Sequence, residues 1–381
     1  MKDILLLDDA IISPLGFSTQ ENIEAVKAGR SGLLFHEHKR FPLGGFYAGI
    51  IDAELLADEF LKIGNPSKYT KLEQMMLLAI QKVLVANPKI KPSTTGLIIS
   101  TTKGNIDLLK GGHSFAEDRF TLNSLAKVIQ EHFNFKSQPI LVSNACISGG
   151  LAVIMAKRFI QSGKFNSAIV VAGDLVSDFV ISGFQSFQAL SQNPCKPFSK
   201  QRNGLSLGEA ATAIYISKDS AAANTVSIIG DATANDANHI SGPSRTGEGL
   251  YLSIVKSLEE ASISAKEIDH ISSHGTATVF NDEMEAIAFK RSGLENAAVN
   301  SYKGLYGHTL GASALLETII TKHSLLNNEL YKSHNFDELG VSVPLKIIQE
   351  TEKRELKYAL KTASGFGGSN MALVLKKLEN A

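Results

Sequence analysis

The sequence predicts an α/β protein in which helices cover the sheets, and three observations support this class. Short apolar runs typical of buried strands alternate along the chain with longer segments whose apolar residues have helical spacing. Residues 139–145, which include Ile140, Leu141 and Val142, precede one such helical segment at residues 151–161. The chain has 381 residues, 44% of them hydrophobic, which is enough for two ordinary domains or one large duplicated domain.

The first half begins with a short apolar strand at residues 4–7 and a helix at residues 19–29. Ser18 is a candidate N-cap for that helix because Glu21 follows three residues later, which is the capping-box pattern. We expect residues 30–66, which are rich in Gly and Phe, to be irregular. The rest of this half is expected to contain helices at 67–86, 120–133 and 151–161, a helix or ordered loop at 178–190, a loop at 193–208, and strands at 96–101, 139–145, 168–172 and 210–216.

The second half repeats the alternation. The expected strands are 226–231, 268–272, 298–300, 358–362 and 371–375, and the expected helices are 250–261, 282–290 and 310–326. The Ala-rich segment 219–225 is the predicted junction between halves at residues 1–222 and 223–381. The run from Cys146 to Gly150 and the run from Gly307 to Ala312 both lie before a helix, which suggests two similar halves whose helix N-termini face one site.

Charge and cysteine content narrow the class of protein. The 38 basic and 38 acidic residues cancel, so bulk charge gives no reason to expect nucleic acid or an anionic membrane as a partner. Two cysteines cannot form a disulfide framework and fit a reducing compartment. No stretch approaches the roughly 18 apolar residues of a membrane span, so we expect a soluble cytoplasmic protein.

Cys146 is a candidate nucleophile because it lies at the turn between a buried strand and a helix. The free N–H groups and the positive end of the helix dipole favour a thiolate at such a position. The small neighbours leave room for a substrate carbonyl to approach the sulfur. A single Cys beside an apolar run is more often a small buried hydrophobic residue, so this stretch alone leaves both interpretations open.

Two histidines lie in similar positions at element ends. His274 follows the strand at 268–272, where catalytic side chains are common in α/β folds. His308 lies where a turn enters a helix, and the helix dipole disfavours its protonated form. Each histidine alone is more often structural. A Cys with two histidines is also compatible with zinc, but no pair has the close spacing of ligands on one loop, so we expect no metal.

Two other features have an ordinary interpretation beside a functional one. Lys303 alone is more often a solvated cation. The three glycines at 365, 367 and 368 are most simply a turn, although they would also let backbone N–H groups point at a ligand.

The joint pattern resembles the β-ketoacyl-ACP synthases of the thiolase superfamily over nearly the whole chain. The motifs that carry the resemblance, in family order, are Ile12-Ser13-Pro14-Leu15-Gly16; Asn144-Ala145-Cys146-Ile147-Ser148-Gly149-Gly150; Pro197-Phe198-Ser199-Lys200-x-Arg202-Asn203-Gly204 with Gly208-Glu209-Ala210; His274-Gly275-Thr276-Ala277-Thr278-x-x-Asn281-Asp282; Lys303-x-x-x-Gly307-His308; and Gly365-Phe366-Gly367-Gly368-Ser369-Asn370. Together they are far more specific than any one motif. The resemblance implies a thiolase-like fold of two similar halves in a five-layered αβαβα core.

The resemblance also implies the chemistry of an elongating condensing enzyme with a Cys-His-His site and no cofactor. Cys146 would take the acyl group from the phosphopantetheine of an acyl carrier protein. His274 and His308 would stabilise the enolate that forms when malonyl-ACP loses CO₂. Lys303 would set the electrostatics of the site, with Glu285 as its acidic partner. The further implied residues are the N–H groups of Cys146 and Phe366 as an oxyanion hole, Phe366 as a gate, Thr276, Thr278, Gly367 and Gly368 as substrate-binding residues, and Asn281 and Asp282 as supports.

The implied partners are an acyl carrier protein and a second subunit, in a homodimer or in a heterodimer with a ketosynthase-like chain. The carrier would dock by its acidic helix on a basic patch, for which Lys103, Lys110, Arg119 and Lys127 are examples of available residues. The short first half favours a dedicated polyene or polyketide pathway over ordinary fatty acid synthesis.

Single residues distinguish this chain from the usual family pattern and from related classes of protein. Ile147 stands where the family commonly has a Ser, and we expect it to narrow the entrance to the active site or to make that entrance more apolar. Cys195 matches no thiolase motif and is interpreted as structural. A chain-length-factor-like partner subunit is the alternative, disfavoured because such subunits usually lose the nucleophile. A CoA-dependent thiolase or initiating synthase is disfavoured because initiating synthases carry Asn at the position of His308.

Overall fold

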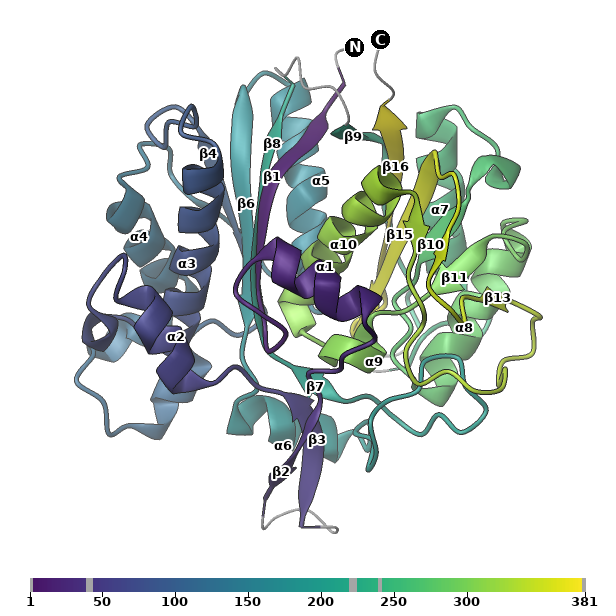
Figure 1. Cartoon of the computed structure of the whole chain (residues 1–381), viewed down its shortest axis with the longest axis horizontal. Coiled ribbons are helices and arrows are strands. Elements are labelled where there is room, and N and C mark those ends of the chain that lie inside the picture. The colour runs from purple at the N-terminus through teal and green to yellow at the C-terminus, as the bar shows by residue number, and fades with distance from the viewer. Residues whose placement is uncertain (1–2, 39–43, 219–224, 239–241, 379–381) are drawn as a thin grey trace.

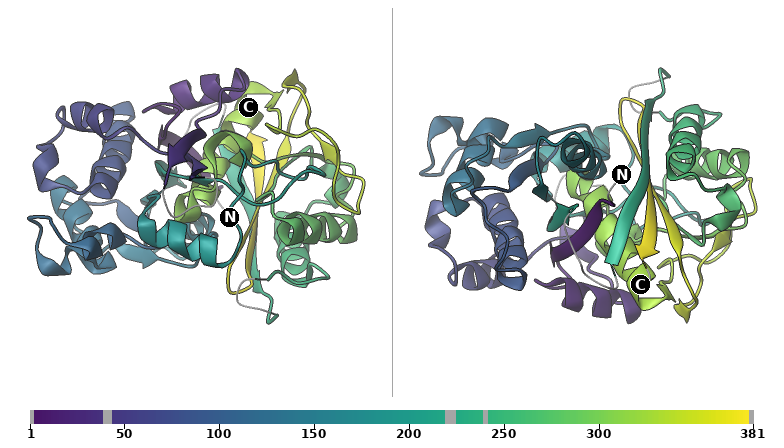
Figure 2. Two further views of the ribbon diagram at one scale, coloured as in Figure 1. Left: turned by 90° about the horizontal axis from the view of Figure 1, so that it is seen from below. Right: turned by 90° about the horizontal axis from the view of Figure 1, so that it is seen from above.

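The computed structural model describes residues 3–38, 44–218, 225–238 and 242–378, and arranges them in five alternating layers of helix and sheet (Figure 1). Figure 2 shows the same layers from below and from above. The outer helices of the first half are α3 (Lys71–Ala86) and α4 (Leu122–Phe133), the central pair is α5 (Ser148–Gln161) and α10 (Ser313–Asn327), and the outer helices of the second half are α7 (Glu248–Ala261) and α8 (Val279–Arg291). This arrangement confirms the predicted αβαβα class.

The sheet of the first half contains five strands that lie between α3 and α5. Their order in space is β5 (Ile140–Val142), β4 (Gly96–Ser100), β6 (Ser167–Asp174), β8 (Ala210–Ser217) and β1 (Leu5–Ile12). The pairs β5–β4 and β4–β6 are parallel, whereas β6–β8 and β8–β1 are antiparallel. β1 also pairs with β9 of the second half at Leu5–Ser227 and Leu6–Val226, so the two sheets are joined by this short contact.

The sheet of the second half has the same topology. Its order in space is β11 (Ala298–Asn300), β10 (His270–Ser272), β15 (Tyr358–Gly365), β16 (Ser369–Leu378) and β9 (Thr225–Asn235), with β13 (Lys346–Ile347) beyond β11. If β13 is left aside and the five main strands of each sheet are numbered along the chain, both sheets have the spatial order third, second, fourth, fifth, first. The directions of the paired strands also match. The two similar halves are thereby confirmed. The predicted boundary at 222/223 lies outside the described residues and stays a prediction.

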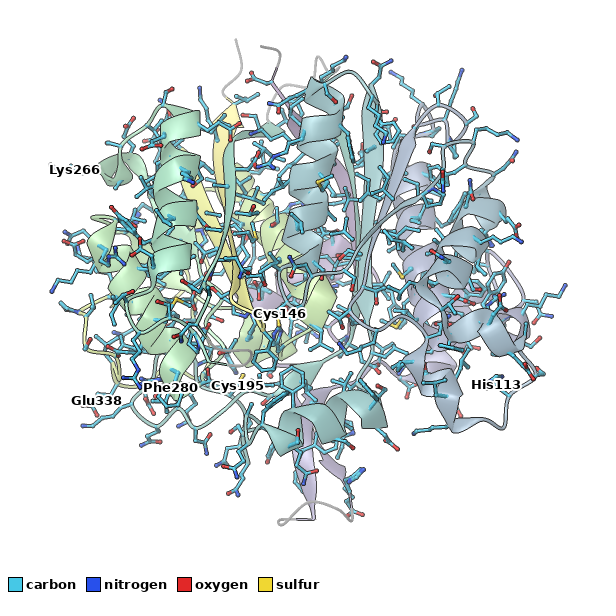
Figure 3. The ribbon with its side chains drawn as sticks, turned by 180° about the vertical axis from the view of Figure 1, so that it is seen from behind. His113, Cys146, Cys195, Lys266, Phe280 and Glu338 are labelled. Atoms are coloured by element: carbon cyan, nitrogen blue, oxygen red, sulfur yellow. The ribbon has the colours of Figure 1, made fainter. Side chains whose placement is uncertain are left out.

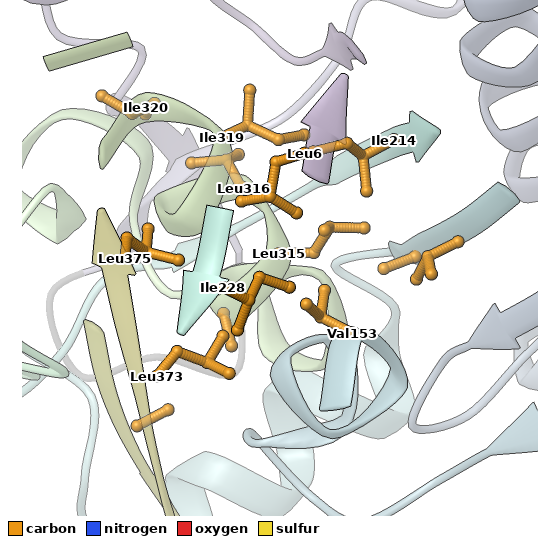
Figure 4. Packing of buried hydrophobic residues seen from close by; sticks show 14 of the residues in the cluster. Leu6, Val153, Ile214, Ile228, Leu315, Leu316, Ile319, Ile320, Leu373 and Leu375 are labelled. Carbon is orange, nitrogen blue, oxygen red and sulfur yellow. The ribbon is translucent and has the colours of Figure 1, made fainter. Parts of the chain in front are cut away.

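The central helices are held by a core of large aliphatic side chains between the two sheets. Val153 of α5 and Leu315, Leu316 and Ile319 of α10 are all buried in this cluster (Figure 4). Full burial of one such side chain contributes about 1.5–3 kcal/mol. A Cβ on Gly149 would lie 2.7 Å from the carbonyl oxygen of Gly311, so glycine is needed where the two helix entrances meet.

A local capping signal accounts for the start of the first helix, but local patterns failed for residues 30–66. Helix α1 (Thr19–Lys27) begins where predicted, because the Ser18 hydroxyl accepts the N–H of Glu21 at 3.2 Å. The expectation that residues 30–66 are irregular is wrong, because they contain β2 (Leu34–Glu37), β3 (Gly45–Gly49) and α2 (Ala53–Phe60). β3 pairs with β7 (Leu207–Gly208), a partner about 160 residues away that no local pattern reveals.

The remaining elements are short or peripheral. They are α6 (Asp178–Ser186), α9 (Lys303–Tyr306), β12 (Glu329–Leu330) and β14 (Glu352–Lys353). Residues 178–190, for which the sequence left a helix or an ordered loop open, are therefore helical over most of their length. Within the described ranges, no helix combines the length and the hydrophobicity needed to cross a bilayer.

Candidate active site

Cys146 lies in a tight turn between β5 and α5, near the middle of the molecule (Figure 3). Ala145 has φ of 43°, a left-handed conformation that is unusual for a residue with a side chain. The Ser148 hydroxyl stabilises this turn, since it accepts the N–H of Asn144 at 2.8 Å and donates to the carbonyl of Ala145 at 2.6 Å. The thiol that this turn presents lies close to His274 and His308 of the second half.

The β15–β16 turn packs directly against the nucleophile. A Cβ on Gly365 would lie 3.0 Å from the backbone nitrogen of Cys146, so only glycine lets the two segments approach without displacement. The backbone N–H of Phe366 faces the Cys146 thiol and lowers its pKa. This N–H is the one that the resemblance implied for the oxyanion hole.

The structure brings Cys146, His274 and His308 together from three separate regions of the chain. The sulfur and one nitrogen of each ring all lie within 4.8 Å of one another. The two rings meet edge to face, with centroids 5.2 Å apart. Cys146 lies before α5 and His308 before α10, so the predicted meeting of two helix entrances at one site is confirmed, and His274 joins them from the loop after β10.

Hydrogen bonds at Nδ1 define the tautomer of both histidines. Nδ1 of His308 accepts the N–H of Leu310 at 3.2 Å, and Nδ1 of His274 faces the Lys303 ammonium at 3.3 Å. Because an ammonium and a backbone N–H can only donate, each ring carries its proton on Nε2. Both rings therefore present an N–H donor to the shared space.

Burial keeps both imidazoles neutral. It lowers the pKa of His274 and of His308 well below the ordinary value, and the nearby Lys303 charge lowers both further. The expectation that His308 stays neutral is confirmed, although burial rather than the helix dipole is the first cause.

The expected thiolate at Cys146 is not what the structure favours. Only 7% of Cys146 is exposed, and this burial raises the pKa of its thiol to about 11. Lys303 and the Phe366 N–H lower the pKa but do not offset the loss of solvation. The prediction from the helix N-terminus was wrong in direction because it took no account of burial, so the resting group is the protonated thiol.

The expected pairing of Lys303 with Glu285 is also wrong. Lys303 donates to Glu317 at 2.7 Å and to the carbonyl oxygen of His274 at 2.5 Å. The Glu285 carboxylate instead accepts the N–H groups of His274 at 2.8 Å and Gly275 at 2.6 Å. Glu285 lies on α8 beside this turn, where it satisfies two buried N–H groups that no strand pairs. Burial, followed by the charge of Asp282, raises its pKa to about 7.

Two charged residues of the site were missed by the sequence reasoning. Glu317 accepts hydrogen bonds from Lys303 through one oxygen and from Lys361 through the other, at 2.7 and 2.5 Å. Lys361 is fully buried on β15. The available signal was a Lys inside the apolar strand 358–363 and a Glu inside the apolar helical run 314–320.

The predicted supporting residues surround the loop after His274. Asp282 accepts the N–H of Phe198 at 2.7 Å, and burial raises its pKa to about 6. The Asn281 amide donates to Glu285 at 2.9 Å. The hydroxyls of Thr276 and Thr278 lie 2.9 Å apart.

A cavity of about 510 Å³ connects the thiol to the surface. The predicted residues that line it are Cys146, His274, Thr276, Thr278, Asn281, His308, Phe366 and Gly368. Val279 and Phe280 also line it and are 51% and 76% exposed, so the cavity opens to solvent beside them. The Phe366 ring stacks on Phe184 with centroids 5.6 Å apart, beside the cavity.

Gly367, Ile147 and Cys195 lie outside this lining, as do Lys303, Glu285 and Asp282. Gly367 is exposed on the outer side of the β15–β16 turn, so its predicted contact with substrate stays a prediction. Ile147 is buried in the central core rather than at an entrance, which corrects the expectation for this residue. The Cys195 thiol donates to the carbonyl oxygen of Lys303 at 3.1 Å, in agreement with a structural role.

Cys146, His274 and His308 are residue types that bind zinc. Among the described residues, they form the group of potential metal ligands whose donor atoms lie close enough together to hold an ion. The ammonium of Lys303, 3.3 Å from Nδ1 of His274, adds a positive charge that disfavours a divalent cation. The geometry therefore suits hydrogen-bond donation to an anion better than metal binding.

Comparison with known families decides between the classes weighed above. Residues 9–222 match the model for the N-terminal domain of β-ketoacyl synthases, and residues 226–337 match the model for the C-terminal domain. The chain belongs to the β-ketoacyl synthase family. The Cys-His-His cluster has the composition that the resemblance implied for this family, which confirms the predicted enzyme class.

Curated relatives and solved structures agree with this family over the full length. The chain is 25% identical over 404 residues to 3-oxoacyl-[acyl-carrier-protein] synthase 2 of Vibrio harveyi, covering 97% of each protein. It is 26% identical over 428 residues to the enzyme of the same name from Rhizobium meliloti, covering 99% of each. A chain of the ketosynthase ApeO–chain length factor ApeC complex from Xenorhabdus doucetiae superimposes with a TM-score of 0.87 at 23% identity, covering 99% of this β-ketoacyl synthase and 98% of that chain. That likeness confirms the thiolase-like fold.

Proposed function

We propose that this β-ketoacyl synthase condenses an acyl thioester with malonyl-ACP by decarboxylative Claisen chemistry. The observation that carries the proposal is one thiol within 4.8 Å of two imidazole nitrogens, in a cavity that reaches the surface. The presence of Cys146 disfavours the chain-length-factor alternative, because a subunit without catalysis does not need a nucleophile.

The first step is acyl transfer to Cys146. Its sulfur attacks the carbonyl carbon of the acyl-ACP thioester, the bond from that carbon to the pantetheine sulfur breaks, and the thiol proton ends on the departing pantetheine. The N–H groups of Cys146 and Phe366 are the proposed donors to the oxyanion. Loss of one such donor typically costs about 10²–10³ in rate.

The second step uses the histidines as donors. The Nε2–H groups of His274 and His308 bind the thioester oxygen of malonyl-ACP. The bond between the malonyl α-carbon and the carboxylate then breaks, CO₂ leaves, and the electron pair of that bond forms the enolate. The enolate carbon attacks the acyl carbon on Cys146, the carbon–sulfur bond breaks, and the released thiolate takes a proton from solvent. Neutral rings suit this role because they donate hydrogen bonds to the thioester oxygen. A charged imidazolium would instead pair with the malonyl carboxylate that has to leave.

The proposed partners are an acyl carrier protein and a second subunit, either a copy of this chain or a ketosynthase-like chain. β5 ends the first sheet, so its outer edge is available to a strand of another subunit. Of the four basic residues named above for carrier docking, Arg119 contacts the buried Glu73 at 2.8 Å, whereas Lys127 is exposed. We therefore favour Lys127 over Arg119 for that role. A cytoplasmic location and a dedicated polyene or polyketide pathway complete the proposal.

The test combines acylation with condensation. Incubation with acyl-ACP should add one acyl mass to Cys146 in intact-protein mass spectrometry, and later addition of malonyl-ACP should yield β-ketoacyl-ACP. A folded Cys146→Ala variant is the control. Absence of any adduct on the folded wild-type protein would contradict the proposal and favour the partner-subunit alternative. Equal turnover with malonyl-CoA would favour the CoA-dependent class instead.

A further inference from the structure

Lys361 is a second buried ammonium beside the reacting groups. Its side chain is 0% exposed, and Nζ donates to the Glu317 carboxylate at 2.5 Å and to the carbonyl oxygens of Ser272 and Ser273 at 3.2 Å each. Ser272 ends β10, and Ser273 immediately precedes His274. Lys361 therefore contacts the segment that places one catalytic imidazole.

Glu317 links this lysine to the other one. Lys303 and Lys361 bind opposite oxygens of the same carboxylate, at 2.7 and 2.5 Å. Two cations share one anion in this buried row, and the carboxyl groups of Asp282 and Glu285 lie on the other side of His274. The charged or titratable groups packed around the histidines are Cys146, Asp282, Glu285, Lys303, Glu317 and Lys361.

We propose that Lys361 is a positioning residue of the condensing site, which holds Glu317 and the Ser272–Ser273 backbone in place and adds a positive charge that reinforces the neutral state of His274 and His308. The part of this inference that concerns malonyl thioesters rests on the proposed function.

A purely structural role would not require a lysine. Burying an ammonium is costly, and its carbonyl acceptors could be satisfied by an uncharged donor. The Lys361 charge also lowers the pKa of both His274 and His308, after the larger effects of burial and Lys303. Removal of this charge should therefore raise both histidine pKa values.

The experiment compares Lys361→Met with Lys157→Met. Lys157 is an equally buried lysine on α5 that binds Asp231 and Glu260 at 2.8 and 2.6 Å, none of which lines the cavity. Lys361→Gln is the second charge-removing variant, because its amide can still donate to the carbonyls if the methionine variant does not fold. The readouts are the ¹⁵N chemical shifts of histidine-labelled protein against pH, and the decarboxylation of malonyl-ACP against pH.

Both Lys361 variants should raise the pKa of the two histidines and move the acid limb of decarboxylation to higher pH. Lys157→Met should leave both unchanged. A lower plateau with an unmoved acid limb and unmoved histidine shifts would overturn the inference, because only packing would have been lost. A wild-type protein that decarboxylates no malonyl thioester would instead refute the proposed function, and the histidine titration would still decide the role of Lys361.

Discussion

The turn before α5 in the first half and the turn before α10 in the second half occupy matching positions in two sheets of the same strand order. The first presents a thiol, Cys146, and the second presents an imidazole, His308. The other buried charged groups nearest the site, Lys303, Glu317 and Lys361, also belong to the second half. The first half therefore supplies the nucleophile, and the second half supplies Lys303, the charge with the largest effect on it, while Lys103 and Asp174 of the first half have smaller effects.

This division predicts that acyl transfer and decarboxylation can be separated by mutation. It also explains the unusual environment of the thiol. Cys146 is buried where its own turn in the first half meets the β15–β16 turn of the second half, and this burial is the main reason that it stays protonated. The second half contributes the positive charge and the N–H donors that become effective once an acyl group or a developing anion is present.

The largest expected effect comes from removing the nucleophile that the first half supplies. Cys146→Ala should reduce acyl-enzyme formation and condensation by about 10⁴-fold or more, because no other thiol lines the described cavity. Decarboxylation of malonyl-ACP should persist, since His274, His308 and Lys303 are unchanged. Mass spectrometry and CO₂ release measure the two steps. Loss of both steps in a folded variant would show that the halves are not separable.

The pH dependence of the thiol sharpens the comparison. With a thiol pKa of about 11, the rate of alkylation by iodoacetamide should rise about tenfold per pH unit, or about 10³-fold from pH 6 to 9, without a plateau. The thiolate fraction grows with pH throughout this range because the pKa lies above it. Peptide mapping should place the label on Cys146, with Cys195→Ala as the control for the second thiol. A plateau below pH 8 would mean that the helix terminus outweighs burial.

The next effect breaks the second half alone. His308→Ala should lower the rate of malonyl-ACP decarboxylation by about 10²–10³-fold, which is the usual cost of one lost donor to a developing oxyanion. Acyl transfer to Cys146 should change less than tenfold. His113→Ala, at an exposed histidine near the edge of the molecule in Figure 3, is the matched control and should leave both rates unchanged. A parallel loss of acyl transfer would mean that His308 also acts on the thiol.

Sequence reasoning predicted the meeting of distant residues better than their immediate partners. Motif order and element ends were enough to bring Cys146, His274 and His308 to one site, because strand ends in matching halves converge. Burial around Cys146 depends on the β15–β16 turn, more than 200 residues away, so the local turn alone predicted the wrong direction of its pKa. β3 was missed for the same reason, since its partner β7 lies far along the chain.

The partner of Lys303 could not be chosen from the sequence for a different reason. Glu285 and Glu317 both lie in helices that pack near the site, and only the rotation of each helix decides which carboxylate faces the ammonium. α8 turns Glu285 toward the backbone N–H groups of His274 and Gly275, while α10 turns Glu317 toward the two lysines.

The smallest expected effect tests this assignment within the second half. A double-mutant cycle of Lys303→Met with Glu317→Gln should give a coupling of about 1–3 kcal/mol in the free energy of unfolding, because these groups bond at 2.7 Å. The matched cycle of Lys303→Met with Glu285→Gln should give less than about 0.5 kcal/mol, since the Glu285 oxygens accept backbone N–H groups instead. Urea denaturation measures both cycles. A larger coupling in the Glu285 cycle would restore the pairing expected from the family resemblance, and it would remove Glu317 as the link between the two buried lysines.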